Sequence, residues 1–478
     1  MRAFLFLIFL TLVSCSGITS YNDQIFPAYE AYIEGDLNVA ADIAGAIADE
    51  NYQSNSRVIF QLESGTMLRD AGLYLDAFQA FELAEATLKA GYDERSALHY
   101  SAIAENAASV LVNQKNLAYL GTVSDRVLLN TYKALCMFEL GELDNALVEA
   151  RRIDQAQQRA EQFFKNEYDA VKEAGNAQGY VLDMEALYRD EQFISANKDL
   201  FFSQGISDFR NPFATYVIGL LRRIAPENGE SPAFDFNWLA ERIPNNRFII
   251  KEQKKIDSGI PPTGSVYVIF ENGVGPFLRQ QLIRIPRGIY RNTIQGPLLQ
   301  EDYIALPKLI SGKPAANFLK VSGANKMQLS TSLIADMNKI VRYEFSQRYP
   351  KILRKELFSA SIKGLIFSPV EAYAEEQLNS DREEDNPLLG ALMLFGTNFT
   401  KKMIAQADDR AWKSIASNYQ IAHFDRDDLE SITLSLSNDQ VAKEVPLPDA
   451  EVVVIFARSV HSSHLNVRTY LIGESRME

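Results

Sequence analysis

The sequence predicts an α-helical repeat domain followed by an α+β domain. In the first half of the chain, small and apolar residues recur at spacings of three and four, which place them on one face of a helix. β-Branched and aromatic runs bounded by turns begin only after the lysine-rich stretch 251–255. We therefore expect a signal peptide at 1–14, a tether at 15–26, helical repeats at 27–248 and the α+β domain at 249–478.

The totals describe a globular chain that is long enough for two or three domains. Of its 478 residues, 47% are hydrophobic and 23% are charged. The formal net charge of −14 disfavours nucleic acid as a partner, because binding to phosphates requires a basic surface. There are two cysteines and four histidines, so neither a disulfide framework nor a metal cluster is expected.

The first fifteen residues indicate export and a lipid anchor. Arg2 precedes an apolar run at 3–13, which is too short to span a bilayer and has the form of a signal-peptide core. The run ends in LVSC, which resembles the bacterial lipobox, with Cys15 as the residue that would carry acyl chains. Ser16 follows it in place of an aspartate, so the pattern implies the periplasmic face of the outer membrane. A general signal peptide with a coincidental cysteine is the alternative.

Residues 65–84 carry the repeat pattern most completely. A glycine at a corner, Gly72, is followed by apolar or small residues two, five, nine and twelve positions later. The same offsets recur from Gly35 and from Gly141. Gly35 and Gly72 are 37 residues apart, and Gly72 and Gly141 are 69 apart, which is close to two repeat lengths. The stretch 94–120 lacks the corner glycine and is interpreted as a degenerate repeat.

This spacing resembles the tetratricopeptide repeat, a helix–turn–helix unit of about 34 residues. Stacked units of that kind form a concave surface that is lined by the first helix of each repeat and that binds protein segments. The resemblance places six residues on this surface: Leu62, Thr66, Arg69, Thr131, Leu135 and Phe138. The alternative for Leu135 and Phe138 is packing against the next helix.

Further helices are expected at 154–173, 180–189, 191–201 and 234–242, and 211–216 is expected to start another repeat, with Pro212 in a first turn. Strands are expected at 265–271, 277–285, 303–309, 317–321, 419–424, 431–436, 451–457 and 466–472. Between these groups, 330–361 is expected to be helical with a break at Pro350, and 388–395 is a short apolar core segment. Because the strands flank a helical block and do not alternate with helices, an α+β arrangement is favoured.

No stretch favours catalysis or a bound cofactor or metal. His461 and His464 are three apart in a region expected to be extended, where they would face opposite sides. His423 precedes Asp425, but no motif ties them to a nucleophile. Cys136 lies in an apolar helix and is expected to be a buried, inert thiol.

The whole chain resembles an uncharacterised family of bacterial lipoproteins that combine tetratricopeptide repeats with an α+β domain. The resemblance is carried by NPFATYVIGLL, SVYVIFENGVGPF and ADDRAWKSIASNYQIAHF, in which Trp412 is near the centre. It implies an association with lipoproteins similar to the curli secretion channel and to activators of peptidoglycan synthases. Ile415-Ala416 departs from the leucine-proline expected after the tryptophan.

Together these observations predict a non-enzymatic adaptor or scaffold in a cell-envelope complex concerned with secretion or the cell wall. It would bind envelope proteins through the repeat groove and the membrane through Cys15. One alternative is a structural component of a secretion or motility assembly. Another is an enzyme that acts on the cell wall or its glycans through the α+β half.

Overall fold

The structure of the protein is a computed structural model, and parts of the chain are described in it. The described residues are 20–105, 117–176, 210–225, 229–285, 302–324, 326–379 and 406–474, with short pieces at 180–182, 189, 191, 194–195, 290–292 and 296–297. Cys15, the predicted signal peptide and the apolar stretch 388–395 lie outside these residues. Among the described helices, none is long and apolar enough to cross a membrane.

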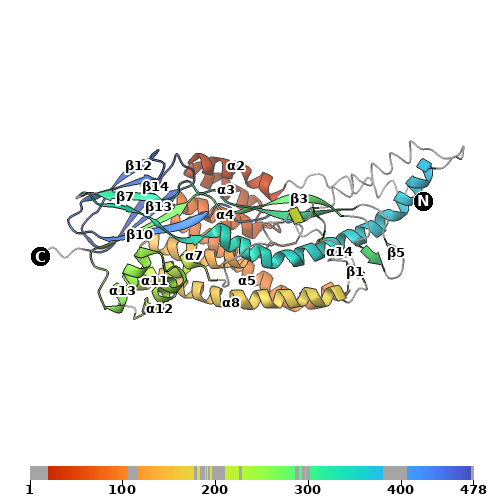
Figure 1. The fold of residues 1–478 in the computed structure, drawn as a ribbon, viewed down its shortest axis with the longest axis horizontal. Coiled ribbons are helices and arrows are strands. Elements are labelled where there is room, and N and C mark those ends of the chain that lie inside the picture. Colours follow the sequence, from red (N-terminus) through yellow and green to blue (C-terminus); the bar gives the residue numbers. More distant parts are fainter. Residues whose placement is uncertain are drawn as a thin grey trace.

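The first half of the chain consists of helices that pack consecutively against one another (Figure 1). They are α2 (Tyr21–Glu34), α3 (Leu37–Glu50), α4 (Arg57–Asp70), α5 (Tyr74–Glu105), α7 (Val123–Glu139) and α8 (Leu143–Asn176). The predicted corner glycines Gly35, Gly72 and Gly141 join α2 to α3, α4 to α5 and α7 to α8. Their φ angles of +91°, +86° and +80° lie in the left-handed region that favours glycine. The predicted corners are therefore confirmed.

Gly65 lets α4 and α5 approach closely. A Cβ atom at this position would lie 2.6 Å from the ring of Phe81, which is itself fully buried. α5 continues to Glu105, so the first part of the expected degenerate repeat is helical, while residues 106–116 lie outside the described part of the chain.

Three shorter helices follow: α11 (Pro212–Ile224), α12 (Ala233–Arg242) and α13 (Arg247–Asp257). Asn211 caps α11 by accepting hydrogen bonds from the N–H groups of Phe213 and Ala214, with Pro212 in the first turn as expected. α13 runs through the expected domain boundary at 249. Before these helices, Tyr180–Leu182 forms strand β1, where the sequence predicted a helix. It pairs with β4 (Tyr290–Asn292), and this partner, distant in sequence, decides the local structure.

The second half is rich in sheet. A five-stranded sheet has the order β14-β13-β2-β10-β9, formed by β14 (Asn466–Glu474), β13 (Ala450–Ser459), β2 (Ser265–Asn272), β10 (Asn418–Asp425) and β9 (Ser332–Asp336). β13 and β2 are parallel, and the other pairs are antiparallel. A four-stranded sheet contains β12 (Ala442–Pro446), β11 (Ser431–Leu436), β7 (Leu319–Gly323) and β8 (Gln328–Ser330). β3 (Phe277–Ile285) pairs with β6 (Asp302–Ile310), and β4 pairs with β5 (Gly296–Pro297).

All eight expected strands are present within a few residues of their expected bounds, but the stretch 330–361 is different. Its start is strand β9, and helix α14 (Met337–Asn379) then continues through Pro350 without the expected break. β9 forms because it pairs with β10. Around the proline, α14 is supported by its buried side: Phe345, Tyr349 and Leu353 are buried, and the rings of Phe345 and Tyr349 are 5.6 Å apart.

The helical and sheet-rich halves share one hydrophobic core, which includes Phe60 and Tyr132 from the helices and Ile269 and Phe456 from the large sheet. The strand register places Tyr267, Glu271, Tyr419 and Arg458 on the sheet face that meets the helices. Figure 1 shows the helices beside this sheet, with α8 and α14 extending away from it along the molecule.

Two glycine substitutions test the close approach of α4 and α5. Gly45 lies within α3, and a Cβ atom there would meet nothing within 4 Å, whereas at Gly65 it would overlap Phe81. We expect Gly45→Ala to stabilise the protein by about 0.5–1 kcal/mol through helix propensity. Gly65→Ala should instead destabilise it by about 1–3 kcal/mol through overpacking. Urea unfolding of both variants measures this, and an equal gain for the two would contradict the packing described here.

Candidate functional site on the inner face of the helices

The six residues expected to bind a partner are all buried. Their exposed fractions are 0% for Leu62, Thr66, Arg69 and Thr131, 2% for Leu135 and 4% for Phe138. The sheet-rich half of the same chain contacts three of them, Thr66, Arg69 and Phe138. They therefore do not line an open groove in this structure, which corrects the prediction of an open concave surface. We call the side of the helices that carries these six residues the inner face. It binds a segment of its own chain.

The segment that crosses α2 and α4 is the irregular stretch 406–417, which precedes β10. Glu63 of α4 accepts hydrogen bonds from the backbone N–H groups of Lys413, at 2.9 Å, and Ser414, at 3.0 Å. The hydroxyl group of Tyr21 donates to Glu63, at 2.6 Å, and to the carbonyl of Ala411, at 3.1 Å. These bonds satisfy buried backbone groups that belong to no regular secondary structure.

Trp412 is the central side chain of this segment, and it is 2% exposed. Its indole N–H donates to the hydroxyl group of Thr66, at 2.9 Å. Its ring packs at centroid distances of 5.5 Å from Tyr132 and 5.9 Å from Phe81. Thr66 and Phe81 therefore form part of an aromatic pocket, with one polar contact, that is filled from within the chain.

Charged and polar side chains on both sides of Trp412 also hold the segment. Arg410 donates to the carbonyls of Asn55 and Leu117, and Asn22 donates to the carboxylate of Asp409, at 2.8 Å. The ammonium group of Lys413 lies 4.6 Å from the centroid of the Tyr29 ring. Burial lowers the pKa of Lys413, although Glu63 and Asp409 partly oppose this effect.

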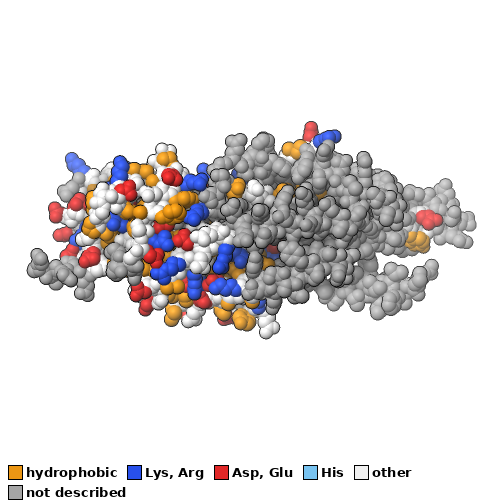
Figure 2. All heavy atoms as spheres, turned by 90° about the horizontal axis from the view of Figure 1, so that it is seen from below, with side chains coloured by type: hydrophobic (Ala, Val, Ile, Leu, Met, Phe, Trp, Pro, Cys, Tyr) orange, Lys and Arg blue, Asp and Glu red, His pale blue; other side chains and the backbone are white. Residues whose placement is uncertain are grey.

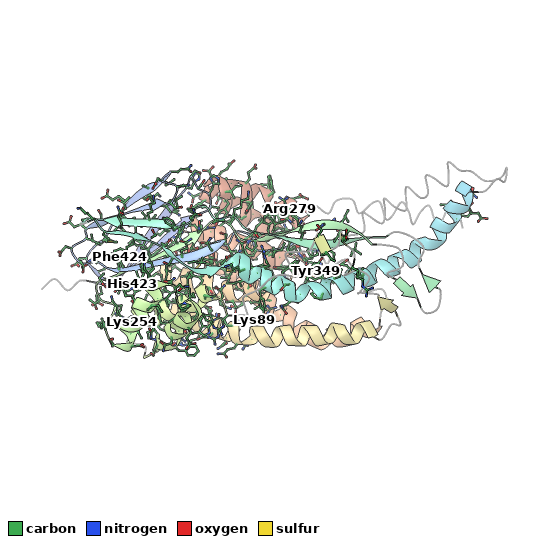
Figure 3. The ribbon with its side chains drawn as sticks, in the orientation of Figure 1. Lys89, Lys254, Arg279, Tyr349, His423 and Phe424 are labelled. Carbon is green, nitrogen blue, oxygen red and sulfur yellow. The ribbon has the colours of Figure 1, made fainter. Side chains whose placement is uncertain are left out.

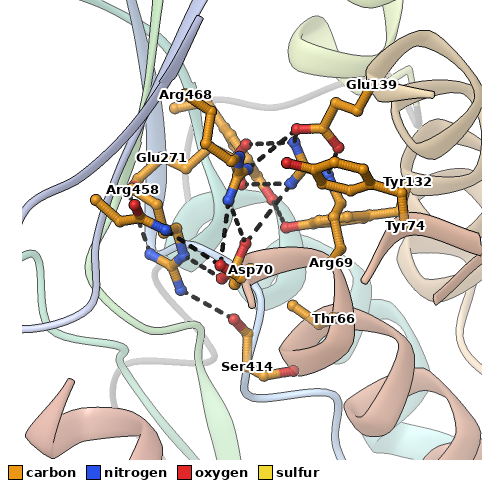
Figure 4. A network of polar contacts seen from close by, with 12 residues as sticks. Thr66, Arg69, Asp70, Tyr74, Tyr132, Glu139, Glu271, Ser414, Arg458 and Arg468 are labelled. Carbon is orange, nitrogen blue, oxygen red and sulfur yellow. Dashed lines mark hydrogen bonds and ion pairs between the residues drawn. The ribbon is translucent and has the colours of Figure 1, made fainter. Parts of the chain in front are cut away.

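A buried network of three guanidinium and three carboxylate groups joins the helices to the large sheet (Figure 4). Arg69 donates to Glu139 of α7, at 2.6 and 3.0 Å, and to Glu271 of β2, at 2.9 and 3.0 Å. The other members are Asp70, Arg458 and Arg468. With equal numbers of each sign the network is formally neutral, as its burial requires.

The ionisation of the carboxyl groups depends on these partners. Burial opposes the ionisation of Asp70, but Arg458, Arg468 and Arg69 outweigh it and hold the pKa of Asp70 below its usual range. At Glu139, burial is the larger effect and raises the pKa, with Arg69 and Arg468 opposing it. Sequence reasoning found Arg69 but not its partners. The sequence feature that could have indicated these partners is a charged residue at the end of an apolar strand. It occurs as Glu271 in SVYVIFE and as Arg458 in EVVVIFARS.

A second buried polar cluster surrounds His423, whose place in the molecule is labelled in Figure 3. Its Nδ1 atom lies 3.0 Å from a carboxylate oxygen of Glu252, and its ring stacks on Tyr267 at a centroid distance of 4.5 Å. Glu252 also accepts hydrogen bonds from Arg223, at 2.7 Å, and from Tyr267, at 3.0 Å. Burial lowers the pKa of His423 to about 4, with Glu252 partly opposing the shift.

The remaining candidate residues fall outside any shared site. His461 and His464 lie in the loop between β13 and β14, where both contact the hydroxyl group of Ser463, so they do not face opposite sides of a strand. Cys136 is fully buried, as predicted, and burial raises the pKa of its thiol. Within the described ranges, no group of histidine, cysteine or acidic residues could hold a metal ion.

The described surface is chemically mixed. Figure 2 shows basic and acidic side chains interspersed with apolar ones on the face that it presents. Comparison of the chain with protein-family models, with curated proteins and with solved structures finds no match.

Removal of one carboxylate tests the neutral network. Glu139→Gln leaves Arg69 and Arg468 without one of their buried counter-charges, and we expect a loss of about 3–5 kcal/mol in the free energy of unfolding. Glu142→Gln is the matched control, because Glu142 is exposed and should cost less than about 0.5 kcal/mol. Equal urea midpoints for the two variants would contradict the role given to the network.

The His423 cluster predicts a pH dependence of stability. The pKa of His423 is about 4 in the folded protein and ordinarily 6.5, so between these values the unfolded chain binds a proton that the folded chain does not. Stability should therefore fall as the pH drops from 6.5 to about 4, by about 3 kcal/mol in total for this group. His423→Gln should remove that part of the dependence. A stability difference between wild type and variant that is the same at about pH 8 and about pH 5 would exclude it.

Proposed function

We propose that this protein is a non-enzymatic scaffold that holds protein partners of a cell-envelope complex at the periplasmic face of the outer membrane. In this proposal Cys15 carries the lipid anchor and the helical half is a tetratricopeptide-like array. The observation that carries the proposal is the binding of segment 406–417 by the inner face. Glu63 and Tyr21 contact its backbone, and Thr66 and Phe81 help to hold Trp412.

That mode of contact is typical of a helical array that holds an extended segment, with side chains bonded to the backbone and an aromatic anchor in a pocket. The glycine corners and the close approach at Gly65 support the repeat assignment. Because the inner face is filled by the chain itself, partners would bind to other surfaces of the molecule.

Cys15→Ser tests the anchor and the scaffold together. We expect the wild-type protein to partition with membranes and to incorporate labelled fatty acid, and the variant to be released to the periplasm, because the acyl chains supply the membrane affinity. Crosslinking in intact cells should join the wild-type protein to specific envelope proteins. Membrane association that persists in the variant would refute lipidation, and a wild-type protein without specific crosslinks would refute the scaffold.

A further inference from the structure

The two larger sheets have four edges, and three of them are protected against pairing with another strand. β9 is short and irregular, and the side-chain amide of Asn246 donates to the carbonyl of Leu333 on it. β12 carries Lys443, Glu444 and Pro446. β8 has three residues. Short length, irregular register, charge and proline are the usual means by which proteins block sheet edges.

The fourth edge, β14, has none of these features on its exposed side between Asn466 and Ile472; Gly473 then has a φ angle of +71°, and Glu474 ends the strand. It has nine residues without proline, and in the described chain it pairs only with β13. Arg468, its one basic residue, points inward to Glu139 and is 10% exposed. Leu471 is 49% exposed. β14 therefore presents an unpaired row of backbone groups together with an exposed apolar side chain.

The glycine corners of the helices lie along this strand. Gly35 is next to the ring of His464, Asn466 donates to the carbonyl of Asp70, and the hydroxyl of Tyr470 donates to that of Tyr74. The corners carry exposed apolar side chains, with exposed fractions of 50% for Val39, 41% for Leu73, 54% for Leu75 and 39% for Leu140. These corner residues form an apolar border on the side of β14 that faces the helices. Leu471 lies on the opposite side of the strand, because Arg468 and Tyr470, which alternate with it, contact Glu139 and Phe138.

A cavity of about 620 Å³ continues this border at the start of β14. Its lining includes Val39 from the first corner, Lys443 from β12 and Leu465 from the loop before β14. The cavity could receive a bulky side chain from a strand that is added to β14.

The charges at the corners indicate which kind of segment would bind beside β14. Exposed acidic residues are found at each corner, Asp36, Asp76 and Glu142, and the chain has a net charge of −14. A second copy of the chain would bring these acidic corners together, which is unfavourable. A segment with basic residues at its ends would be attracted to them.

We propose that the free edge of β14 is a docking site for an extended segment of a partner protein, with alternating apolar residues and basic flanks. The segment adds a strand to the five-stranded sheet. Its backbone pairs with β14. Because the side chains of a strand alternate between the two faces of a sheet, the segment's apolar side chains lie beside Leu471, and the residues between them face the corner residues. This inference rests on the scaffold function proposed above, and it names the kind of partner that the scaffold holds.

The probe is a synthetic peptide of alternating valine and threonine with lysines at both ends, added to the full chain in detergent. We expect saturable binding by fluorescence anisotropy. Leu471→Lys should weaken it at least about tenfold, because the new charge repels the lysines and replaces an apolar contact. Leu83→Lys is the matched control, since Leu83 is a similarly exposed leucine, at 44%, within α5 and away from the corners, and it should bind as wild type.

Two modified peptides test the mode of binding on the wild-type chain, independently of any effect on folding. N-methylation of alternate amides should abolish binding, because it removes the donors of the strand ladder, and aspartates in place of the lysines should do the same.

Absence of binding by the wild type, or equal binding by Leu471→Lys, would overturn the proposal. A wild-type dimer that Leu471→Lys dissolves would also overturn it, in favour of a second copy. If crosslinks to envelope proteins persist in the Leu471→Lys variant, the scaffold proposal is kept and only the docking site at β14 is refuted.

Discussion

The buried guanidinium group of Arg69 is the constraint on which the arrangement of the two halves depends. A charge without access to water requires counter-charges, and those of Arg69 come from Glu139 in the helical half and Glu271 in the large sheet. Replacing such a network with apolar residues can be neutral for stability, so its main effect is on specificity. It permits one placement of α4 against β2, in which all the charges are paired. This makes the helices and the sheet parts of one core.

The backbone of segment 406–417 is subject to the same requirement, that every buried polar group has a partner. A buried stretch without regular structure leaves N–H and C=O groups that must find partners elsewhere. Glu63, Tyr21 and Tyr32 supply them for residues 411–414. The residues on the inner face of the helices thus have the chemistry of a binding groove. What they bind is a segment of the same chain.

Local patterns in the sequence predicted the local structure well. Gly35, Gly72 and Gly141 mark corners because only glycine adopts their backbone angles at little cost, and alternating or β-branched runs mark the strands. The predictions are wrong where residues distant in sequence determine the local structure. Residues 180–182 and β9 are strands because other strands pair with them. Thr66 and Arg69 contact Trp412 and Glu271, and no pattern in the sequence shows that these distant residues would meet α4.

A filled inner face limits how the proposed scaffold could hold its partners. In an open repeat array, side-chain pockets in the groove select the partner, whereas here those pockets are satisfied by Trp412 and its neighbours. The docking proposed at β14 is an alternative means of attachment, in which bonds to the main chain would supply affinity and only alternate side chains would determine specificity. The helices then have an indirect part. They hold the sheet through Arg69 and Asp70, and their corners supply the apolar and acidic border beside its free edge.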